Sequence, residues 1–164
     1  MTIDLMQTEL MKTQSRVHAN CVICSSSNER GLRLAFALLE EGSVETAFNC
    51  DEAFKGYANV LHGGMISSLL DGAMTSCMFA HGCSAVTAEL NVQFRHPVVA
   101  GQAATVRAWI TRSAPPLYIL KAEVLQDGQV KAMTTGKFMD QPNLAATETA
   151  ARGRQQQSHT KGNV

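Results

Sequence analysis

Hydrophobic positions follow one helical repeat that is set among several strand repeats. The helical positions are spaced i, i+3, i+4, i+7 and i+11, at Ile66, Leu69, Leu70, Ala73 and Cys77. This spacing gathers them on one face of an α-helix. The sequence therefore predicts one long helix whose apolar stripe is covered by other elements.

Strand-like alternation occurs on both sides of this helix. Apolar residues occupy alternate positions in four segments, 32–38, 44–48, 86–94 and 106–110. Two more segments, 118–125 and 129–139, flank Asp127-Gly128, a pair typical of a two-residue hairpin turn. A period of two places one strand face on a core. It is clearest at Val86, Ala88, Leu90, Val92 and Phe94, which we expect to share a face.

The order of these elements predicts an α+β domain with a largely antiparallel sheet and one principal helix. This domain is expected at residues 21–140. Apolar and polar residues alternate only weakly in residues 1–20, and residues 141–164 contain almost no large apolar side chains. We therefore expect a flexible N-terminal segment and a disordered C-terminal tail.

Composition narrows the environment and the partners. The chain has 164 residues, a length that predicts one domain. Its 14 basic and 14 acidic side chains balance, so no overall positive potential is expected to attract nucleic acid. No apolar run reaches the roughly 20 residues that span a bilayer. The N-terminus lacks the pattern of a secretory signal, so a cytoplasmic protein is expected. Five cysteines favour reduced thiols, and the single Cys21-x-x-Cys24 pair gives no expectation of a metal.

Candidate chemistry lies at the start of the predicted helix, in His62-Gly63-Gly64. The first N–H groups of a helix lack intrahelical partners and carry the positive end of its dipole. Two glycines would expose these donors to an anion or a polarised carbonyl. The sequence therefore offers Gly63 and Gly64 as candidate oxyanion donors.

Asp71 follows about two turns later and lies about 140° around the helix from Ile66. Its side of the helix also carries Ser67, Met74, Thr75 and Met78. A group held at a helix mouth by a partner chain, or by a bent ligand, would be within its reach. Each feature also has a structural interpretation: a loop-to-helix glycine pair, a solvated aspartate and a structural histidine.

The combination of His62-Gly63-Gly64 with Asp71 resembles the hotdog-fold acyl-CoA thioesterases of the hydroxybenzoyl-CoA and phenylacetate-pathway (PaaI-like) type. The segment TAELNVQFRHPV, residues 87–98, is similar to the strand that follows the helix in that family. Cys21-Val-Ile-Cys24 with Asn28 and Gly31-Leu32 resembles an N-terminal pattern in one branch. The resemblance implies a curved antiparallel sheet wrapped around one central helix. It also implies a homodimer or homotetramer with active sites at the dimer interface.

The resemblance also implies roles for individual residues. Asp71 would be the nucleophile or general base, a Gly63 or Gly64 amide would polarise the thioester carbonyl, and His62 would shape the turn or orient the ligand. Thr75 matches a position near the attacking water. The implied substrate is an acyl-CoA, with no cofactor beyond the CoA of the substrate, and with neither a nucleic acid nor a membrane as partner.

Candidate substrate-binding residues surround these positions. Phe54, Met74 and Met78 are expected in an adaptable acyl pocket, and Arg95 near the CoA phosphates. Asn59 and Ser67 complete the set. The chain departs from several relatives at Gly56, where they have Asn or Gln.

Two functions remain open from the sequence. The favoured one is an acyl-CoA thioesterase that releases a free acid and CoA. The alternative is a non-catalytic hotdog module that binds an acyl ligand, because one fold serves many functions. A third, a hydratase or dehydratase, would need a different catalytic motif.

Overall fold

The computed structural model describes residues 2–144 of the chain. Its helices are α1 (Ile3–Val17), the short 3-10 helix η1 (Glu52–Phe54) and α2 (Gly63–Ala80). Its strands are β1 (Ala37–Leu38), β2 (Val44–Asn49), β3 (Lys55–Tyr57), β4 (Val60–Leu61), β5 (Ala85–Phe94), β6 (Ala103–Ala114), β7 (Leu117–Gln126) and β8 (Gln129–Asp140). The tail expected at 141–164 lies outside the described residues beyond residue 144.

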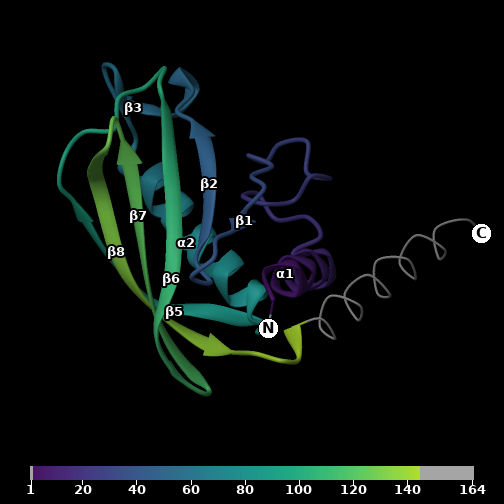
Figure 1. Ribbon diagram of the computed structural model, residues 1–164. Helices are drawn as coiled ribbons and strands as arrows, with labels where there is room; N and C mark the ends of the chain where they lie inside the picture. Colours follow the sequence, from purple (N-terminus) through teal and green to yellow (C-terminus); the bar gives the residue numbers. More distant parts are fainter. Residues whose placement is uncertain (1, 145–164) are drawn as a thin grey trace, which may run out of the picture.

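Six strands form one antiparallel sheet in the order β1-β2-β6-β7-β8-β5, and β3 pairs with β4 separately. The sheet curves around α2, which packs against five of its strands (Figure 1). This is the predicted α+β architecture with one central helix. The Asp127-Gly128 turn joins β7 to β8 with φ of 53° and 72°, the left-handed pair that a type I′ hairpin requires.

Helix α2 supplies the centre of the core. All five residues of the predicted stripe are at most 4% exposed, because the strands cover this side of the helix. The opposing sheet face is built by alternation, as on β7, where Tyr118, Leu120, Ala122 and Val124 are buried. Burying a large aliphatic side chain contributes about 1.5–3 kcal/mol, so this layer is a major source of stability.

The N-terminal segment, residues 1–20, was expected to be flexible, but most of it forms a helix. Residues 3–17 form α1, which packs beside α2 (Figure 1). Leu10, Thr13 and Val17 face inward at spacings of three and four and are at most 7% exposed. The stripe is short and includes a threonine, which explains why the hydrophobic pattern did not reveal it.

Strand β5 differs from the predicted strict alternation at its start. A bulge between Thr87 and Glu89 leaves Ala88 as the extra residue against β8. Such a bulge shifts which side chains face the core. Thr87 lies opposite the buried Phe138 and so shares the helix-facing side with the later apolar residues of β5. The expectation was therefore wrong for Val86 and Ala88.

β5 is also an edge strand, because within residues 2–144 its only sheet neighbour is β8. Two of its large apolar side chains are exposed, Val86 at 39% and Phe94 at 56%. An apolar edge strand with free backbone groups is a surface suited to pairing with another chain.

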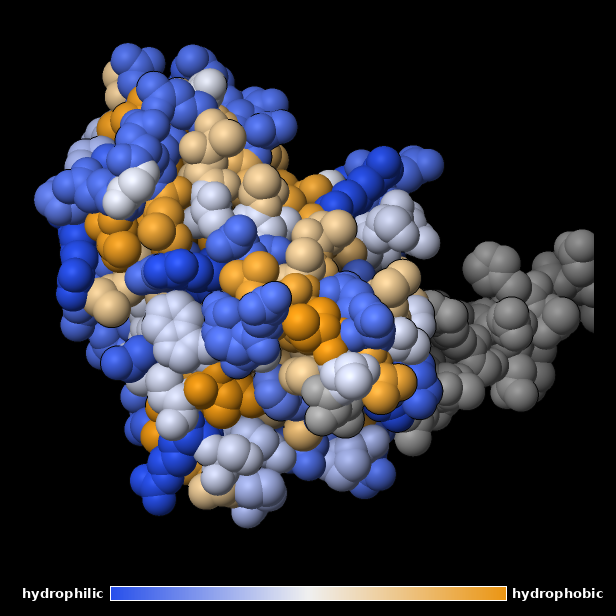
Figure 2. Space-filling view, viewed as in Figure 1, coloured by the Kyte–Doolittle hydropathy of each residue, from blue (hydrophilic) through white to orange (hydrophobic). Residues whose placement is uncertain are grey.

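The outer surface is mixed in character. Figure 2 shows hydrophobic and hydrophilic residues interspersed over one face, consistent with equal numbers of acidic and basic side chains. Within residues 2–144, no helix has both the length and the hydropathy that crossing a bilayer requires.

Candidate active site

The start of α2 is capped by the side chain of His62. Its Nδ1 accepts a hydrogen bond from the Gly64 N–H at 2.9 Å, and its carbonyl accepts from Met65 and Ile66. An N-cap side chain satisfies one of the orphan donors of a helix. The Gly64 amide is therefore already engaged by His62.

Gly63 is placed differently. Within the described residues its N–H donates to no acceptor, since the neighbouring cap bonds involve residues 64, 65 and 66. Gly63 also lines a pocket, which Gly64 does not. Of the two glycines proposed as oxyanion donors, the geometry favours Gly63.

The pocket at this helix start has a volume of about 410 Å³. Its walls come from β3, β4, the first turn of α2 and the end of β5 with the loop that follows. They are formed by Gly56, Tyr57, Val60, Leu61, His62, Gly63, Ile66, Phe94, Arg95, His96, Pro97 and Val98. The walls are mostly apolar, so this pocket suits an acyl or aryl group better than a charged one.

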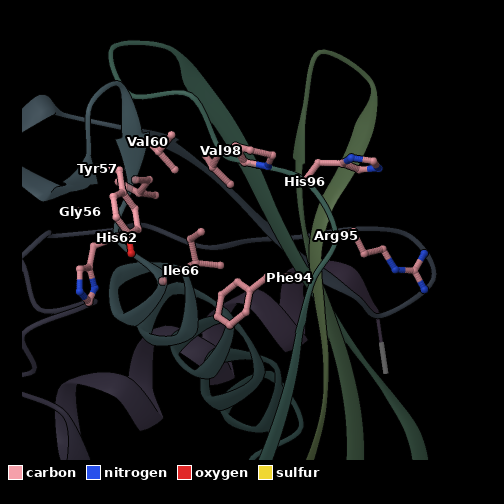
Figure 3. A pocket seen from close by; sticks show the side chains of 12 residues that line it. Gly56, Tyr57, Val60, His62, Ile66, Phe94, Arg95, His96 and Val98 are labelled. Carbon is pink, nitrogen blue, oxygen red and sulfur yellow. The ribbon is translucent and has the colours of Figure 1, made fainter.

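Figure 3 shows how the side chains around this pocket are turned. Phe94 and Ile66 lie over the beginning of α2, whereas the side chains of Arg95 and His96 extend away from it. A Cβ placed on Gly63 would be 3.4 Å from Cζ of Phe94, so the aromatic ring lies close to the free amide. Arg95 therefore contributes to the rim, with its guanidinium directed outward.

Asp71 lies further along α2 and is half-buried. Its Oδ1 accepts a hydrogen bond of 2.6 Å from Oγ1 of Thr87 on β5. Burial raises the pKa of Asp71, while the Thr87 hydrogen bond and the nearby His18 oppose this rise. Asp71 is thus a shielded carboxylate with a single short side-chain bond, which suits a base more than a solvated surface charge.

Asp71 and Gly63 do not meet within one chain. Eight residues separate them on α2, which corresponds to about 12 Å along the helix axis. Asp71 is absent from the walls of the pocket that contains Gly63. A single carbonyl can contact both groups only if a second copy supplies one of them.

Two predicted pocket residues lie elsewhere. Met74 and Met78 are 0% exposed and belong to the core, because their side of α2 is covered by the curved sheet. A Cβ on Gly136 would be 2.9 Å from Cε of Met74, which shows how closely β8 approaches. The expected role in an acyl pocket therefore changes to a role in packing.

The remaining predicted residues flank the site. Phe54 is half-buried and packs on Phe48, with ring centroids 6.1 Å apart. Asn59 occupies the turn between β3 and β4 with φ of 60°. Ser67 donates to the Gly63 carbonyl at 3.0 Å, and Thr75 is 8% exposed one turn beyond Asp71. None of these four lines the pocket at the helix start.

Two residues of the site were not foreseen from the sequence. Thr87 reaches Asp71 only because of the bulge in β5, and alternation gives no signal for that bulge. Gly56 makes room for the cap, because a Cβ there would be 3.0 Å from Cδ2 of His62. The departure from relatives at Gly56 was the available signal, and its reason is steric.

Comparison with known proteins bears on this arrangement. Residues 58–132 match the family model described as the thioesterase superfamily. This range contains the His62 cap, all of α2 and strands β5 to β7. No curated protein matches the chain.

Solved structures extend the similarity to the whole fold. PaaI of E. coli, from the phenylacetic acid degradation operon, is 17% identical with a TM-score of 0.71, over 86% of this chain and 96% of that one. A putative thioesterase of Ralstonia eutropha JMP134, described as phenylacetic acid degradation-related, is 27% identical with a TM-score of 0.60, over 66% and 85%. A Streptococcus mutans UA159 protein solved with acetyl CoA is 18% identical with a TM-score of 0.62, over 66% and 88%.

One similar structure belongs to a longer protein of the thioesterase superfamily. That protein is 21% identical with a TM-score of 0.66, and the alignment covers 70% of this chain but 60% of the other. Residues 58–132 match the model of the thioesterase superfamily, and the chain has the hotdog fold seen in the PaaI-type structures.

Proposed function

We propose that this protein is an acyl-CoA thioesterase that hydrolyses a CoA thioester to a free acid and CoA. The observation that carries the proposal is the shielded Asp71 carboxylate, bonded to Thr87, on the same helix that presents the free Gly63 amide. The thioesterase superfamily match supports the reaction class. The acetyl CoA bound to the S. mutans relative supports the substrate class.

Asp71 acts on water in this scheme. The carboxylate takes one proton from water, the oxygen bonds to the thioester carbon, and the carbon–sulfur bond then breaks so that CoA leaves as a thiol after protonation. Attack by Asp71 itself is the other route, through a mixed anhydride that water hydrolyses. Both routes use only the carboxylate and water, so the proposal includes no cofactor beyond the CoA of the substrate.

The Gly63 amide stabilises the oxyanion that forms on the thioester carbonyl. One fixed donor of this kind contributes about 2.7–4 kcal/mol to lowering the barrier. His62 assists by engaging Gly64 and so fixing the first turn of α2. The neighbouring apolar pocket, with Phe94 and Ile66, accepts the acyl group.

The complete site is proposed to lie between two copies of the chain. Asp71 and Gly63 are about 12 Å apart along one helix, and β5 offers an unpaired edge with exposed Val86 and Phe94. Pairing of two β5 strands would bury this edge and bring the helix of a second copy beside the first. The proposal therefore includes a homodimer, or a homotetramer built from it. It also places the protein in the cytoplasm, which would keep the five free cysteines reduced.

The test is a thiol-release assay across short, long and aryl CoA thioesters with wild-type protein and Asp71→Asn. Loss of general-base catalysis lowers turnover by about 10²–10⁴-fold. Asp127→Asn, in the exposed β7–β8 turn, is the matched control and should retain activity. Near wild-type turnover by Asp71→Asn would remove Asp71 from the mechanism.

The same panel separates the enzyme from a non-catalytic module. Acyl-CoA that binds the wild-type protein without release of CoA, measured by calorimetry beside the thiol assay, would favour a binding module. Release that depends on Asp71 would favour the thioesterase.

A further inference from the structure

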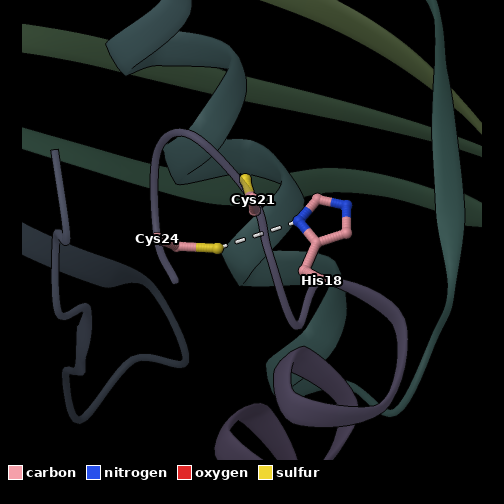
Figure 4. A group of neighbouring side chains, drawn as sticks. All are labelled: His18, Cys21 and Cys24. Atoms are coloured by element: carbon pink, nitrogen blue, oxygen red, sulfur yellow. Dashed lines mark hydrogen bonds between the residues drawn. The ribbon is translucent and has the colours of Figure 1, made fainter. Parts of the chain in front are cut away.

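A second group of reactive side chains lies against the middle and later turns of α2, near Gly72 and Phe79, apart from the pocket at the helix start. His18 ends α1, and Cys21 and Cys24 follow in the next loop (Figure 4). One ring nitrogen of His18 and the two sulfurs all lie within 4.8 Å of one another. Only the cysteine pair is apparent from the sequence, and the fold adds the histidine.

The spacing of these atoms matches a tetrahedral zinc site. Zinc binds sulfur at about 2.3 Å and imidazole nitrogen at about 2.0–2.1 Å, which places adjacent S and N ligands about 3.6 Å apart at the tetrahedral angle. His18 Nδ1 and Cys24 Sγ are 3.7 Å apart. The third ligand atom is close enough to complete the same sphere with small side-chain adjustments.

The loop that holds the cysteines is fixed by the backbone. The Leu32 and Leu34 amides donate to the carbonyls of Val22 and Ile23 at 2.8 and 2.9 Å. A Cβ on Gly31 would be 2.7 Å from the Val22 carbonyl oxygen, and a Cβ on Gly72 would be 2.5 Å from Cγ2 of Ile23. Glycines therefore allow both contacts, and the loop is preorganised against α2 next to Asp71.

The surroundings of the ligands also suit a metal. The Ile23 N–H donates to Cys21 Sγ at 3.3 Å, a contact that orients this sulfur and suits a thiolate ligand. The His18 ring meets Phe79 edge to face at 4.9 Å, which restricts its rotation. Outer contacts of this kind orient ligands in metal sites.

A hollow of about 320 Å³ lies on one side of the cluster, beside His18. Its walls are Met11, Gln14, Ser15, His18, Ala19, Ser25, Ser26 and Ser27. His18 and Cys21 are half-buried, whereas Cys24 is buried. An ion can therefore reach the ligands from solvent, and a water can occupy a fourth position.

We propose that His18, Cys21 and Cys24 bind one zinc ion, with water as the fourth ligand. Binding replaces the thiol protons of Cys21 and Cys24, which are released to solvent, and leaves two thiolates and a neutral imidazole on the metal. No oxidant or reductant takes part. The ion links the end of α1 to the cysteine loop, and both of these already pack on α2 through Phe79 and Gly72, so its role is to fix this corner of the fold.

The ligand set distinguishes zinc from harder cations. Two thiolates and one imidazole select zinc over magnesium or calcium, which prefer oxygen ligands. The two cysteines alone would equally fit a redox pair. Inclusion of His18, held by Phe79 and directed at Cys24, favours the metal.

The experiment titrates the full chain, purified under a phosphine reductant and freed of metal, with Zn²⁺ in competition with a chromogenic chelator. Co²⁺ is then used as a spectroscopic probe. We expect one equivalent of metal, an intense thiolate-to-cobalt charge-transfer band, and a melting temperature that rises with Zn²⁺ concentration because the ion binds only the native state.

Variants locate the ion. Cys24→Ser and His18→Ala are each expected to weaken zinc binding by at least about tenfold. Cys83→Ser is the matched control, since this half-buried cysteine lies by Tyr118 and outside the cluster, and it should bind as the wild type does. Circular dichroism on every variant separates loss of binding from loss of fold.

Three results would overturn the proposal. One is wild-type protein that shows no stoichiometric Zn²⁺ binding and no thiolate-to-cobalt band, a readout that needs no variant. Another is unchanged Zn²⁺ binding by a folded double variant that carries Cys21→Ser and Cys24→Ser. The third is a Cys21–Cys24 disulfide in protein purified without reductant, with no metal bound after its reduction.

Discussion

Thr87→Val tests the contact between β5 and the carboxylate of Asp71, the proposed base. Valine keeps the size and branching of threonine but removes the hydroxyl that donates to Asp71 at 2.6 Å. This bond favours the ionised carboxylate and lowers the pKa of Asp71 against the effect of burial. Without it, the carboxylate should hold its proton to higher pH.

The magnitude follows from the strength of such a bond. A hydrogen bond to a charged group contributes about 1.5–3 kcal/mol, and the lower end applies because Thr87 is exposed. About 1.4 kcal/mol corresponds to a factor of ten in an equilibrium constant. On the acidic side of the pH profile, where activity follows the ionised fraction of Asp71, Thr87→Val should be about tenfold slower than wild type.

The assay is the pH dependence of kcat/KM for the best substrate of the thiol-release panel. We expect the acidic limb of Thr87→Val to move to higher pH while the plateau changes little. Thr87→Ser retains the hydroxyl and should keep the wild-type limb. Equal displacement by serine and valine, or no displacement by valine, would refute the role of this hydrogen bond.

Two further variants test stability. Burial raises the pKa of Asp71, so the native state holds the carboxyl proton more tightly than the unfolded chain does and loses stability as pH rises above the ordinary carboxyl range. Asp71→Asn should therefore have a higher melting temperature than wild type at neutral pH, and the difference should shrink on acidification. A lower melting temperature at neutral pH would contradict this. Gly72→Ala places a Cβ 2.5 Å from Ile23 and should lower the free energy of unfolding by about 1–3 kcal/mol in urea titrations. The control Ser68→Ala, exposed on the same helix, should change it by less than about 0.5 kcal/mol.

Much of the central architecture was predictable from periodicity. The stripe from Ile66 to Cys77 gave α2, and Asp127-Gly128 gave the β7–β8 hairpin, because burial on one side and a left-handed turn each leave a local signature. Helix α1 was missed because only Leu10, Thr13 and Val17 mark its buried side. So short a buried stripe leaves only a weak helical pattern in the sequence.

The site could be predicted only in part for a related reason. The His62-Gly63-Gly64 start of α2 is a local motif, so both the motif and Asp71 were visible in sequence. Which glycine amide stays free depends on where the His62 ring lies, and the partner of Asp71 depends on a bulge. Both are set by tertiary contacts, as is the meeting of His18 with the cysteine pair.

The central claim is that the carboxylate and the oxyanion donor of one site come from different copies of the chain. Gly63→Pro removes the N–H of the first helical residue without blocking the helix, because proline is tolerated at this position and His62 already has the extended conformation that precedes proline. Gly63→Ala keeps the N–H and is the control. Gly63→Pro and Asp71→Asn should each be inactive alone, the former by about 10²–10³-fold.

The decisive measurement is the activity of these two inactive variants after they are unfolded and refolded together in equal amounts. In a two-fold dimer with shared sites, half of the dimers are mixed and each mixed dimer has one intact site, so we predict recovery of about a quarter of wild-type activity. A mixture no more active than the separate variants would contradict the account, because both groups would then act within one chain.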